Sequence, residues 1–146
     1  RKDYDGAERH YRKAIELKPS HAAAYNNLGN LLSGVRKDYD GAEKMFRTAI
    51  ELDPTEGTIY SSLGDLLQKR ENYDGAEQQY RKAIEVEPSD AGRHVVFGYF
   101  IETVRKDYEG AERLYRKAIE LDPSFAMAHY NLGEVLLNVR KDYDGA

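Results

Sequence analysis

The chain of 146 residues carries 22 basic and 26 acidic residues, for a net charge of −4 at pH 7, and it contains no cysteine. The balanced charge argues against a nucleic-acid partner, since such binders normally present a net positive surface. The lack of cysteine excludes disulfides and thiolate metal sites. No apolar run in the sequence is long enough to span a bilayer, so we expect no membrane partner. The start does not resemble a signal peptide either, so a cytoplasmic location is the default expectation.

A repeated heptapeptide organises the whole sequence. Arg-Lys-Asp-Tyr-Asp-Gly-Ala begins at Arg1, Arg36 and Arg140, and near-copies begin at Arg70 and Arg105. Successive copies start 35, 34, 35 and 35 residues apart. A fixed period of this length is typical of solenoids, in which each repeat buries its apolar side only against its neighbours. We therefore expect one continuous array over residues 1–146 that serves as a binding scaffold.

The first element in chain order is a helix that begins at the heptapeptide, named helix B, in a partial repeat at residues 1–21. The other kind of helix, helix A, is clearest at residues 22–35, where Leu28, Leu31, Leu32 and Val35 recur at helical spacing. Further A helices are expected at 57–70, 91–104 and 126–139. Complete A–B repeats then span 22–56, 57–90 and 91–125, and residues 126–146 hold a lone helix A. The sequence thus predicts eight helices and no strand.

Each helix B has a start signal and a stop signal. In the second copy, Asp38 or Asp40 can cap the first turn. The helix stops before Pro54, because proline cannot continue a helix comfortably. The same stop is expected at Pro19, Pro88 and Pro123.

Small residues at fixed places indicate close helix packing. A glycine lies in the middle of every helix A, although glycine costs roughly 1 kcal/mol there relative to alanine. An alanine holds one place near the start of every helix B, with a large aromatic residue four places later. The glycines are Gly29, Gly64, Gly98 and Gly133, the alanines are Ala7, Ala42, Ala76 and Ala111, and the aromatic residues are Tyr11, Phe46, Tyr80 and Tyr115. We interpret these glycines as packing devices and not as phosphate loops.

This pattern resembles the tetratricopeptide repeat family. Its motif has an aromatic residue, Leu-Gly and a large apolar residue in helix A; helix B has Tyr, Ala, an aromatic residue, Ala and a closing Pro. The second repeat matches every place, with Tyr60, Leu63, Gly64, Leu67, Tyr73, Ala76, Tyr80, Ala83 and Pro88. The resemblance covers the whole chain. It implies an all-α, right-handed superhelical solenoid of antiparallel helix pairs, in which the A helices line a concave groove for an extended peptide or a partner helix.

Two departures from the family pattern stand out. Repeats one, three and four carry one extra residue between helices A and B, so their turns should differ from that of repeat two. The place after the helix B alanine is usually apolar but is glutamate here, at Glu8, Glu43, Glu77 and Glu112. Each of these glutamates precedes an arginine by four residues, which modestly supports a solvated helix face. We expect this face on the outer, convex surface.

The resemblance also assigns groove places in helix A, where the residues vary between repeats while the packing residues do not. The candidates are Asn26, Asn27, Asn30, Asp65, Lys69, Val95, Tyr99, Glu102, Met127, Tyr130, Asn131 and Glu134. Three acids and one lysine among them favour a neutral or basic peptide, and the apolar members favour one with an apolar anchor. Alternatively, Val95, Val96 and Tyr99 are core residues of a repeat that packs in a shifted way.

Known members of the family and one rival family suggest other ligands. Chaperone-adaptor members hold a C-terminal carboxylate with basic residues at the second, fifth and sixth places of helix A, and none of these is basic here. Members resembling the O-linked N-acetylglucosamine transferase array carry Asn at the sixth place; Asn27 and Asn131 match, but Ser62 and Val96 do not. Pentatricopeptide repeats share the period and read single-stranded RNA. The Leu-Gly pair in helix A and the locally cancelling charges argue against that family.

No residue set in the sequence indicates catalysis, a metal or a cofactor. His94 and His129 occupy the aromatic place of helix A, so packing explains them, while His10 and His21 are solitary. No serine lies in a nucleophile-elbow context, and no glycine-rich loop follows a strand. We therefore expect no enzymatic activity in this chain.

The sequence predicts a protein–protein interaction scaffold that binds its partner in the helix A groove. Two alternatives stay open. The array could be the substrate-recruiting arm of a larger enzyme, similar to O-linked N-acetylglucosamine transferase. It could also be a structural array whose molecules stack end to end, because the first helix B and the last helix A lack partner helices and polar capping repeats.

Overall fold

The computed structural model describes the backbone of residues 2–144 and the side chains of residues 2–139. These residues form eight α-helices and two short π-helical segments, and no strand occurs among them. The elements are α1 (Tyr4–Leu17), α2 (Ala22–Leu31), η1 (Leu32–Arg36), α3 (Tyr39–Leu52), α4 (Gly57–Lys69), α5 (Tyr73–Val86), α6 (Ala91–Phe100), η2 (Ile101–Arg105), α7 (Tyr108–Leu121) and α8 (Ala126–Asp144). The predicted all-α fold is confirmed.

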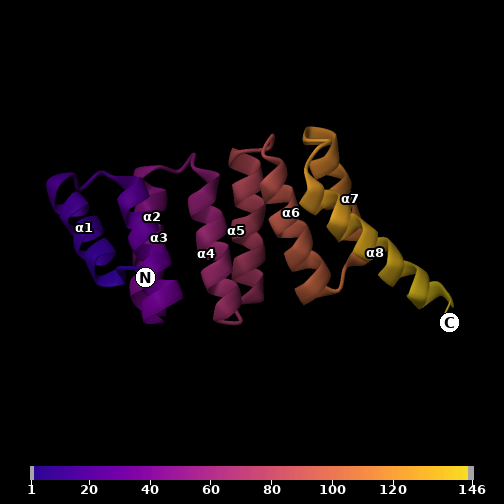
Figure 1. The fold of residues 1–146 in the computed structure, drawn as a ribbon, viewed down its shortest axis with the longest axis horizontal. Coiled ribbons are helices and arrows are strands. Elements are labelled where there is room, and N and C mark those ends of the chain that lie inside the picture. The colour runs from indigo at the N-terminus through magenta and orange to yellow at the C-terminus, as the bar shows by residue number, and fades with distance from the viewer. Residues whose placement is uncertain (1, 145–146) are drawn as a thin grey trace. The chain divides into compact units, whose positions relative to one another are not determined.

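The helices group into two compact units, residues 1–86 with α1 to α5 and residues 87–146 with α6 to α8. Within each unit, consecutive helices lie side by side and run in opposite directions (Figure 1). The most extensive contacts join α4 to α5, α2 to α3 and α6 to α7, which are the three complete A–B pairs. The repeat is therefore one helix pair, as the sequence period indicates.

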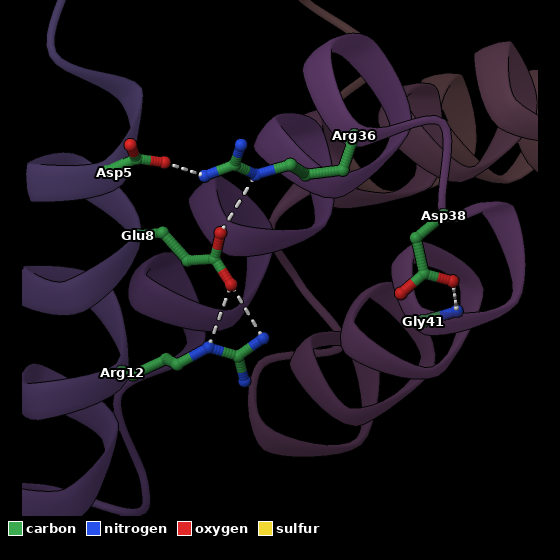
Figure 2. A network of polar contacts seen from close by, with 6 residues as sticks. All are labelled: Asp5, Glu8, Arg12, Arg36, Asp38 and Gly41. Atoms are coloured by element: carbon green, nitrogen blue, oxygen red, sulfur yellow. Dashed lines mark hydrogen bonds and ion pairs between the residues drawn. The ribbon is translucent and has the colours of Figure 1, made fainter.

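The B helices begin at a side-chain cap supplied by the heptapeptide. The Gly41 amide donates to Asp38 Oδ1 at 2.9 Å (Figure 2), so the capping residue is Asp38 and not Asp40. Asp3 and Asp107 cap α1 and α7 in the same way. Satisfying an orphan amide of the first turn stabilises a helix by about 1 kcal/mol. The stop was also predicted correctly, since α3 ends at Leu52, before Pro54.

The mid-helix glycines of three repeats are seats for an aromatic ring. A Cβ atom at Gly29 would lie 2.7 Å from Phe46, and one at Gly64 would lie 2.8 Å from Tyr80. A Cβ at Gly98 would likewise lie 2.6 Å from Tyr115. These distances leave no room for a side chain, so the glycines permit the close A–B approach that the sequence predicted. The matching helix B alanines, Ala42, Ala76 and Ala111, are fully buried.

The extra residue between helices A and B is absorbed by a π-helical turn. In repeat one the Asp38 amide donates to the Leu32 carbonyl oxygen, six residues back, at 3.0 Å. The Asp107 amide makes the same bond to Ile101 at 3.2 Å in repeat three. In the shorter repeat two, the Asn72 amide instead donates to Leu67, five residues back, at 2.9 Å. The predicted difference between these turns is confirmed for repeats one and three.

The last A helix is longer than predicted. We expected it to end at Val139, but α8 continues to Asp144 through the backbone of the final heptapeptide. The turns after α2 and α6 contact the B helices α3 and α7 that follow them. Residues 140–144 instead continue α8, which satisfies their backbone hydrogen bonds within the helix.

Arginines of the heptapeptide join neighbouring repeats in residues 1–86. Arg36 pairs with Asp5 and with Glu8, 3.0 Å from its Nε atom, and Glu8 also accepts from Arg12 of its own helix (Figure 2). Arg12 first and Arg36 second hold the pKa of Glu8 below its usual value. Arg70 repeats the arrangement one repeat later, with Asp40 and Glu43.

These contacts change the interpretation of the charged face. Glu8, Glu43, Glu77 and Glu112 each pair with the arginine four residues later, as predicted. The expectation that the heptapeptide charges cancel locally was wrong for Arg36 and Arg70, because their partners lie in the preceding helix B. The signal was present in the sequence, since arginine, aspartate and glutamate recur with the same period as the helices.

Candidate functional site

The groove candidates of residues 1–86 form a polar surface on the A helices α2 and α4. Asn27 and Asn30 are exposed on α2, and Asp65 and Lys69 are exposed on α4. The Lys69 Nζ atom lies 3.5 Å from Ser33 Oγ, which belongs to the π-helical segment that follows α2. The contacting helices α2 and α4, with the segment η1, thus supply amide, hydroxyl, carboxylate and ammonium groups. Such a surface can exchange hydrogen bonds with the main chain of a ligand.

A buried tyrosine anchors the acid of this surface. The Tyr80 hydroxyl, on α5, donates to Asp65 Oδ1 at 2.6 Å and lies 3.1 Å from Gln68 Oε1. Burial, and then the bond to Asp65, raise the pKa of Tyr80 far above its usual value. Packing around the Asp65 carboxylate raises its pKa too, although the residue as a whole is exposed, while Tyr80 and Lys69 oppose the rise. The hydrogen bond from the buried Tyr80 therefore fixes the position of the Asp65 carboxylate.

Exposed apolar side chains gather on the A helices of residues 87–146. Val96 and Tyr99 on α6 are 40% and 56% exposed, and Met127 and Tyr130 on α8 are 53% and 65% exposed. The two helices contact each other directly. We call these four residues the aromatic patch. Large apolar side chains exposed on two contacting helices make this face a candidate interaction surface.

Two acids lie on the same elements as the aromatic patch or directly after them. Glu134 is exposed on α8, and Glu102 is half-buried in η2, directly after α6, where it accepts from the Tyr115 hydroxyl at 2.8 Å. Burial, and then Glu102, raise the pKa of Tyr115 far above its usual value, so this phenol stays protonated. The pair occupies the places of Tyr80 and Gln68 in repeat two, with glutamate in place of glutamine. The charged groove candidates of residues 87–146 are therefore both acids.

Three groove candidates are buried. Asn26, Val95 and Asn131 are 8%, 6% and 9% exposed. The Oδ1 atom of Asn26 is buried without a hydrogen-bond partner, and Asn131 bonds Tyr115. Val95 packs in the core while Val96 and Tyr99 face solvent, so the shifted-packing alternative describes Val95 and not its neighbours. The groove positions taken from the family motif thus predict the helix face of a residue better than they predict how exposed the residue is.

The structure also has a pocket that the sequence did not reveal. It lies between α1 and α2 and has a volume of about 410 Å³. Its lining combines apolar and aromatic residues with a lysine, an aspartate and two amides, namely Tyr4, Ala7, Tyr11, Leu31, Val35, Lys2, Asp3, Asn27 and Asn30. The available signal was that α1 has no helix A before it among the described residues.

The histidines and acids of the described residues do not gather into a metal site. No group of three or more His, Cys, Asp or Glu side chains lies close enough there to hold a metal ion. His94 is buried, with Nδ1 2.9 Å from the Asp90 carbonyl oxygen. His129 is exposed, but its Nε2 lies 2.9 Å from the Pro123 carbonyl oxygen, in the way that the Tyr60 hydroxyl donates to Pro54. Within the same part of the chain, no helix is long and apolar enough to cross a membrane.

Comparison of the sequence with protein-family models agrees with the observed helix pairs and their mid-helix glycines. A family model described as TPR repeat matches residues 1–34 and 101–139, and one described as Tetratricopeptide repeat matches residues 20–86. The chain belongs to the tetratricopeptide repeat family. The predicted family is thus confirmed. A search of curated proteins found no match to this tetratricopeptide repeat chain.

Solved tetratricopeptide repeat structures share the fold. The crystal structure of MamA superposes with a TM-score of 0.76 at 22% identity, covering 93% of this chain and 78% of MamA. YrrB, described as a TPR protein with an unusual peptide-binding site, gives 0.68 at 28% identity, covering 94% and 70%. The first TPR of Spaghetti (RPAP3), bound to the HSP90 peptide SRMEEVD, gives 0.70 at 18% identity, covering 82% and 93%.

Proposed function

We propose that this tetratricopeptide repeat chain is a non-catalytic protein-interaction scaffold whose aromatic patch receives an apolar side chain of an extended peptide. The observation that carries the proposal is the exposure of Val96, Tyr99, Met127 and Tyr130 on two contacting A helices. These places vary between repeats, whereas the residues that pack the repeats do not. A variable apolar surface on a constant scaffold is what selective binding requires.

The patch has the composition of an interaction hot spot. Tyrosine supplies a large, rigid contact area with a polar tip, and methionine adapts to irregular partners. Burying Tyr99 and Tyr130 removes apolar surface from water, which favours binding by about 25 cal/mol for each Å². The acids Glu102 and Glu134, on the same elements or directly after them, favour a neutral or basic peptide over an acidic one.

The relatives support peptide binding but not a shared ligand. YrrB is described as having a peptide-binding site, and the RPAP3 domain is bound to an HSP90 peptide that ends in acidic residues. An acidic peptide suits basic side chains on the A helices. Here the exposed charged side chains of the two groove surfaces are mostly acids, with Lys69 the lysine of the set. We therefore infer the opposite charge preference for this chain.

The polar surface of α2 and α4 has a complementary role in the proposal. Asn27 and Asn30 are free to reorient in solvent, and an amide can both donate to and accept from a peptide main chain. The Oδ1 atom of Asn26, on the same helix, is buried without a hydrogen-bond partner, so Asn26 itself is not assigned a contact with the ligand. Binding there depends little on ligand sequence, so selectivity is assigned to the aromatic patch.

The test is a selection of random peptides on the whole 146-residue chain, followed by fluorescence anisotropy with the selected peptides. We expect peptides with an apolar residue next to basic ones. The double variant Tyr99→Ala/Tyr130→Ala should bind them at least about tenfold more weakly, since truncating a hot-spot residue costs more than about 1 kcal/mol.

The matched control is Tyr73→Ala, which removes a tyrosine that is 39% exposed outside the patch. It should bind the selected peptides as the unchanged chain does. The proposal fails if the folded double variant, checked by its far-UV circular dichroism, keeps full affinity.

We also propose a second function, a structural array built by self-association. It is favoured by the two end helices, α1 and α8, whose apolar faces are less covered than those of the other helices. Leu17 on α1 is 73% exposed, and Leu137 on α8 is 57% exposed. Repeat proteins normally need polar faces at their ends for solubility.

A further inference from the structure

The first helix presents a B face that nothing covers within the described residues. In α3, α5 and α7 the central aromatic residue packs on a helix A glycine and is 1%, 2% and 0% exposed, at Phe46, Tyr80 and Tyr115. The equivalent Tyr11 of α1 is only half-buried, as are Ala7 and Ala14. Ala7 and Tyr11 line the 410 Å³ pocket. By analogy with the other pairs, this face fits a helix A, whose central glycine leaves room for the Tyr11 ring.

The last helix presents the opposite half of the same contact. A Cβ atom at Gly133 would meet no atom within 4 Å, whereas each of the three earlier glycines meets an aromatic ring. Leu136 is 38% exposed, while the residues at its place in the earlier repeats, Leu32, Leu67 and Ile101, are 5–6% exposed. Helix α8 therefore has the glycine seat and the apolar rim of an A–B pair, and no helix B covers this face in the part of the chain that the structure describes.

We propose that α1 of a second copy of this chain docks on α8, with the Tyr11 ring on Gly133. The proposal rests on the self-association proposed above and gives it a defined contact. It continues an interface that the chain already makes three times, between α2 and α3, α4 and α5, and α6 and α7. Tyr11 is the same residue type as Tyr80 and Tyr115, so the side chain that fits the seat is present.

A polar contact fits the same register. Tyr80 donates to Asp65, which lies one place after Gly64. The place after Gly133 is occupied by Glu134, which is exposed. With Tyr11 on Gly133, its hydroxyl would reach Glu134 as Tyr80 reaches Asp65. The seat is also open from the side of its own chain within the described residues, because a Cβ at Gly133 meets no atom within 4 Å and α8 continues as one helix to Asp144.

This contact is heterologous, since it joins two different surfaces. Each added copy leaves one α1 and one α8 available, so the assembly grows into a closed ring or an open filament and is not an isologous two-fold dimer. That property distinguishes the proposal from a two-fold dimer through either end helix, and from capture of an unrelated helix by either one.

The experiment is sedimentation velocity of the 146-residue chain over a range of concentrations, with one variant at each end. Tyr11→Asp removes the ring from α1, and Gly133→Leu places a large side chain in the seat on α8, where a Cβ meets no atom within 4 Å. The unchanged chain should grow in size with concentration. Each variant alone should stay at the monomer mass of 16.7 kDa.

An equimolar mixture of the two variants provides the decisive readout. The Tyr11→Asp copy keeps an intact α8 and the Gly133→Leu copy keeps an intact α1, so the mixture should form a one-to-one dimer and nothing larger. A monomeric unchanged chain, a variant that still assembles by itself, or a mixture that stays monomeric would each overturn the proposal.

Two controls separate this proposal from peptide binding and from unfolding. Gly34→Leu adds a side chain where a Cβ also meets no atom within 4 Å, but away from either end face, and it should assemble normally. The Tyr99→Ala/Tyr130→Ala variant should assemble normally too, and Tyr11→Asp should bind the selected peptides normally. Loss of assembly with intact peptide binding, or the reverse, shows which of the two proposals has failed.

Discussion

Replacing Gly64 by alanine and replacing Gly133 by alanine should have opposite effects on stability, although the two glycines hold the same place in two repeats. Alanine in the middle of a helix is favoured over glycine by about 1 kcal/mol, and both variants gain this amount. At Gly133 a Cβ meets no atom within 4 Å, so the gain is retained. Gly133→Ala should therefore be about 1 kcal/mol more stable than the unchanged chain.

At Gly64 the gain is outweighed by a clash. The new Cβ would lie 2.8 Å from Tyr80 Cε1 and 3.0 Å from its Cδ1. The ring cannot swing away, because Tyr80 is 2% exposed and its hydroxyl is bonded to Asp65 at 2.6 Å. Overpacking of this kind costs about 1–3 kcal/mol, and the fixed ring favours the upper part of that range. Gly64→Ala should thus be about 1–2 kcal/mol less stable than the unchanged chain.

Urea denaturation followed by far-UV circular dichroism measures the two stabilities, at protein concentrations low enough to prevent association. Because repeat arrays can unfold in segments, amide hydrogen exchange should locate each change. Protection should fall in α4 and α5 for Gly64→Ala and rise in α8 for Gly133→Ala. If Gly64→Ala is as stable as Gly133→Ala, the glycine seats do not hold the repeats together as argued.

Two further predictions concern the caps and the buried phenols. Asp38→Ala removes the bond to the Gly41 amide and should lower the free energy of unfolding by about 1 kcal/mol in urea denaturation, whereas Asp40→Ala leaves the cap in place; equal losses would contradict the assignment. Burial raises the pKa values of Tyr80 and Tyr115 above those of the unfolded chain, so both phenols stay protonated in the folded state while the unfolded chain ionises near pH 10. The contribution of these two tyrosines to the free energy of unfolding is fully present below pH 10. Above pH 10 this contribution is lost, by about 1.4 kcal/mol per pH unit for each tyrosine. Tyr80→Phe and Tyr115→Phe should each flatten the alkaline loss measured by urea denaturation from neutral pH to beyond the unfolded pKa, and an unchanged slope would refute this.

The sequence predicts the scaffold well because its signals are local and repeated. Proline stops, aspartate caps and the Gly64–Tyr80 seat act within one helix pair, so each copy of the repeat reports the same contact. The ion pairs of Arg36 with Asp5 and Glu8 were not predicted, because they join different repeats and depend on how far the arginine side chain reaches. The sequence predicted that the turn before Asp38 differs from the turn of repeat two, but not that it is π-helical. Its hydrogen-bond pattern depends on how the following helix packs.

The candidate surface was harder to predict than the scaffold. Family places locate the groove face, but the exposure of Val95 and Asn26 depends on the exact rotation of each helix and on the size of its neighbours. Val95 and Val96 are adjacent and chemically identical, yet one is core and the other lies in the aromatic patch. Such differences of a fraction of a helical turn are decided by tertiary packing and not by residue type.

The most direct test of recognition by the aromatic patch is a nuclear magnetic resonance titration of the labelled chain with a selected peptide. The account predicts that chemical-shift changes concentrate on Val96, Tyr99, Met127 and Tyr130, in α6 and α8, and saturate with the affinity measured by anisotropy. Changes confined to the charged faces of the B helices, around Arg47 or Arg116, with Tyr99 and Tyr130 unaffected, would contradict it.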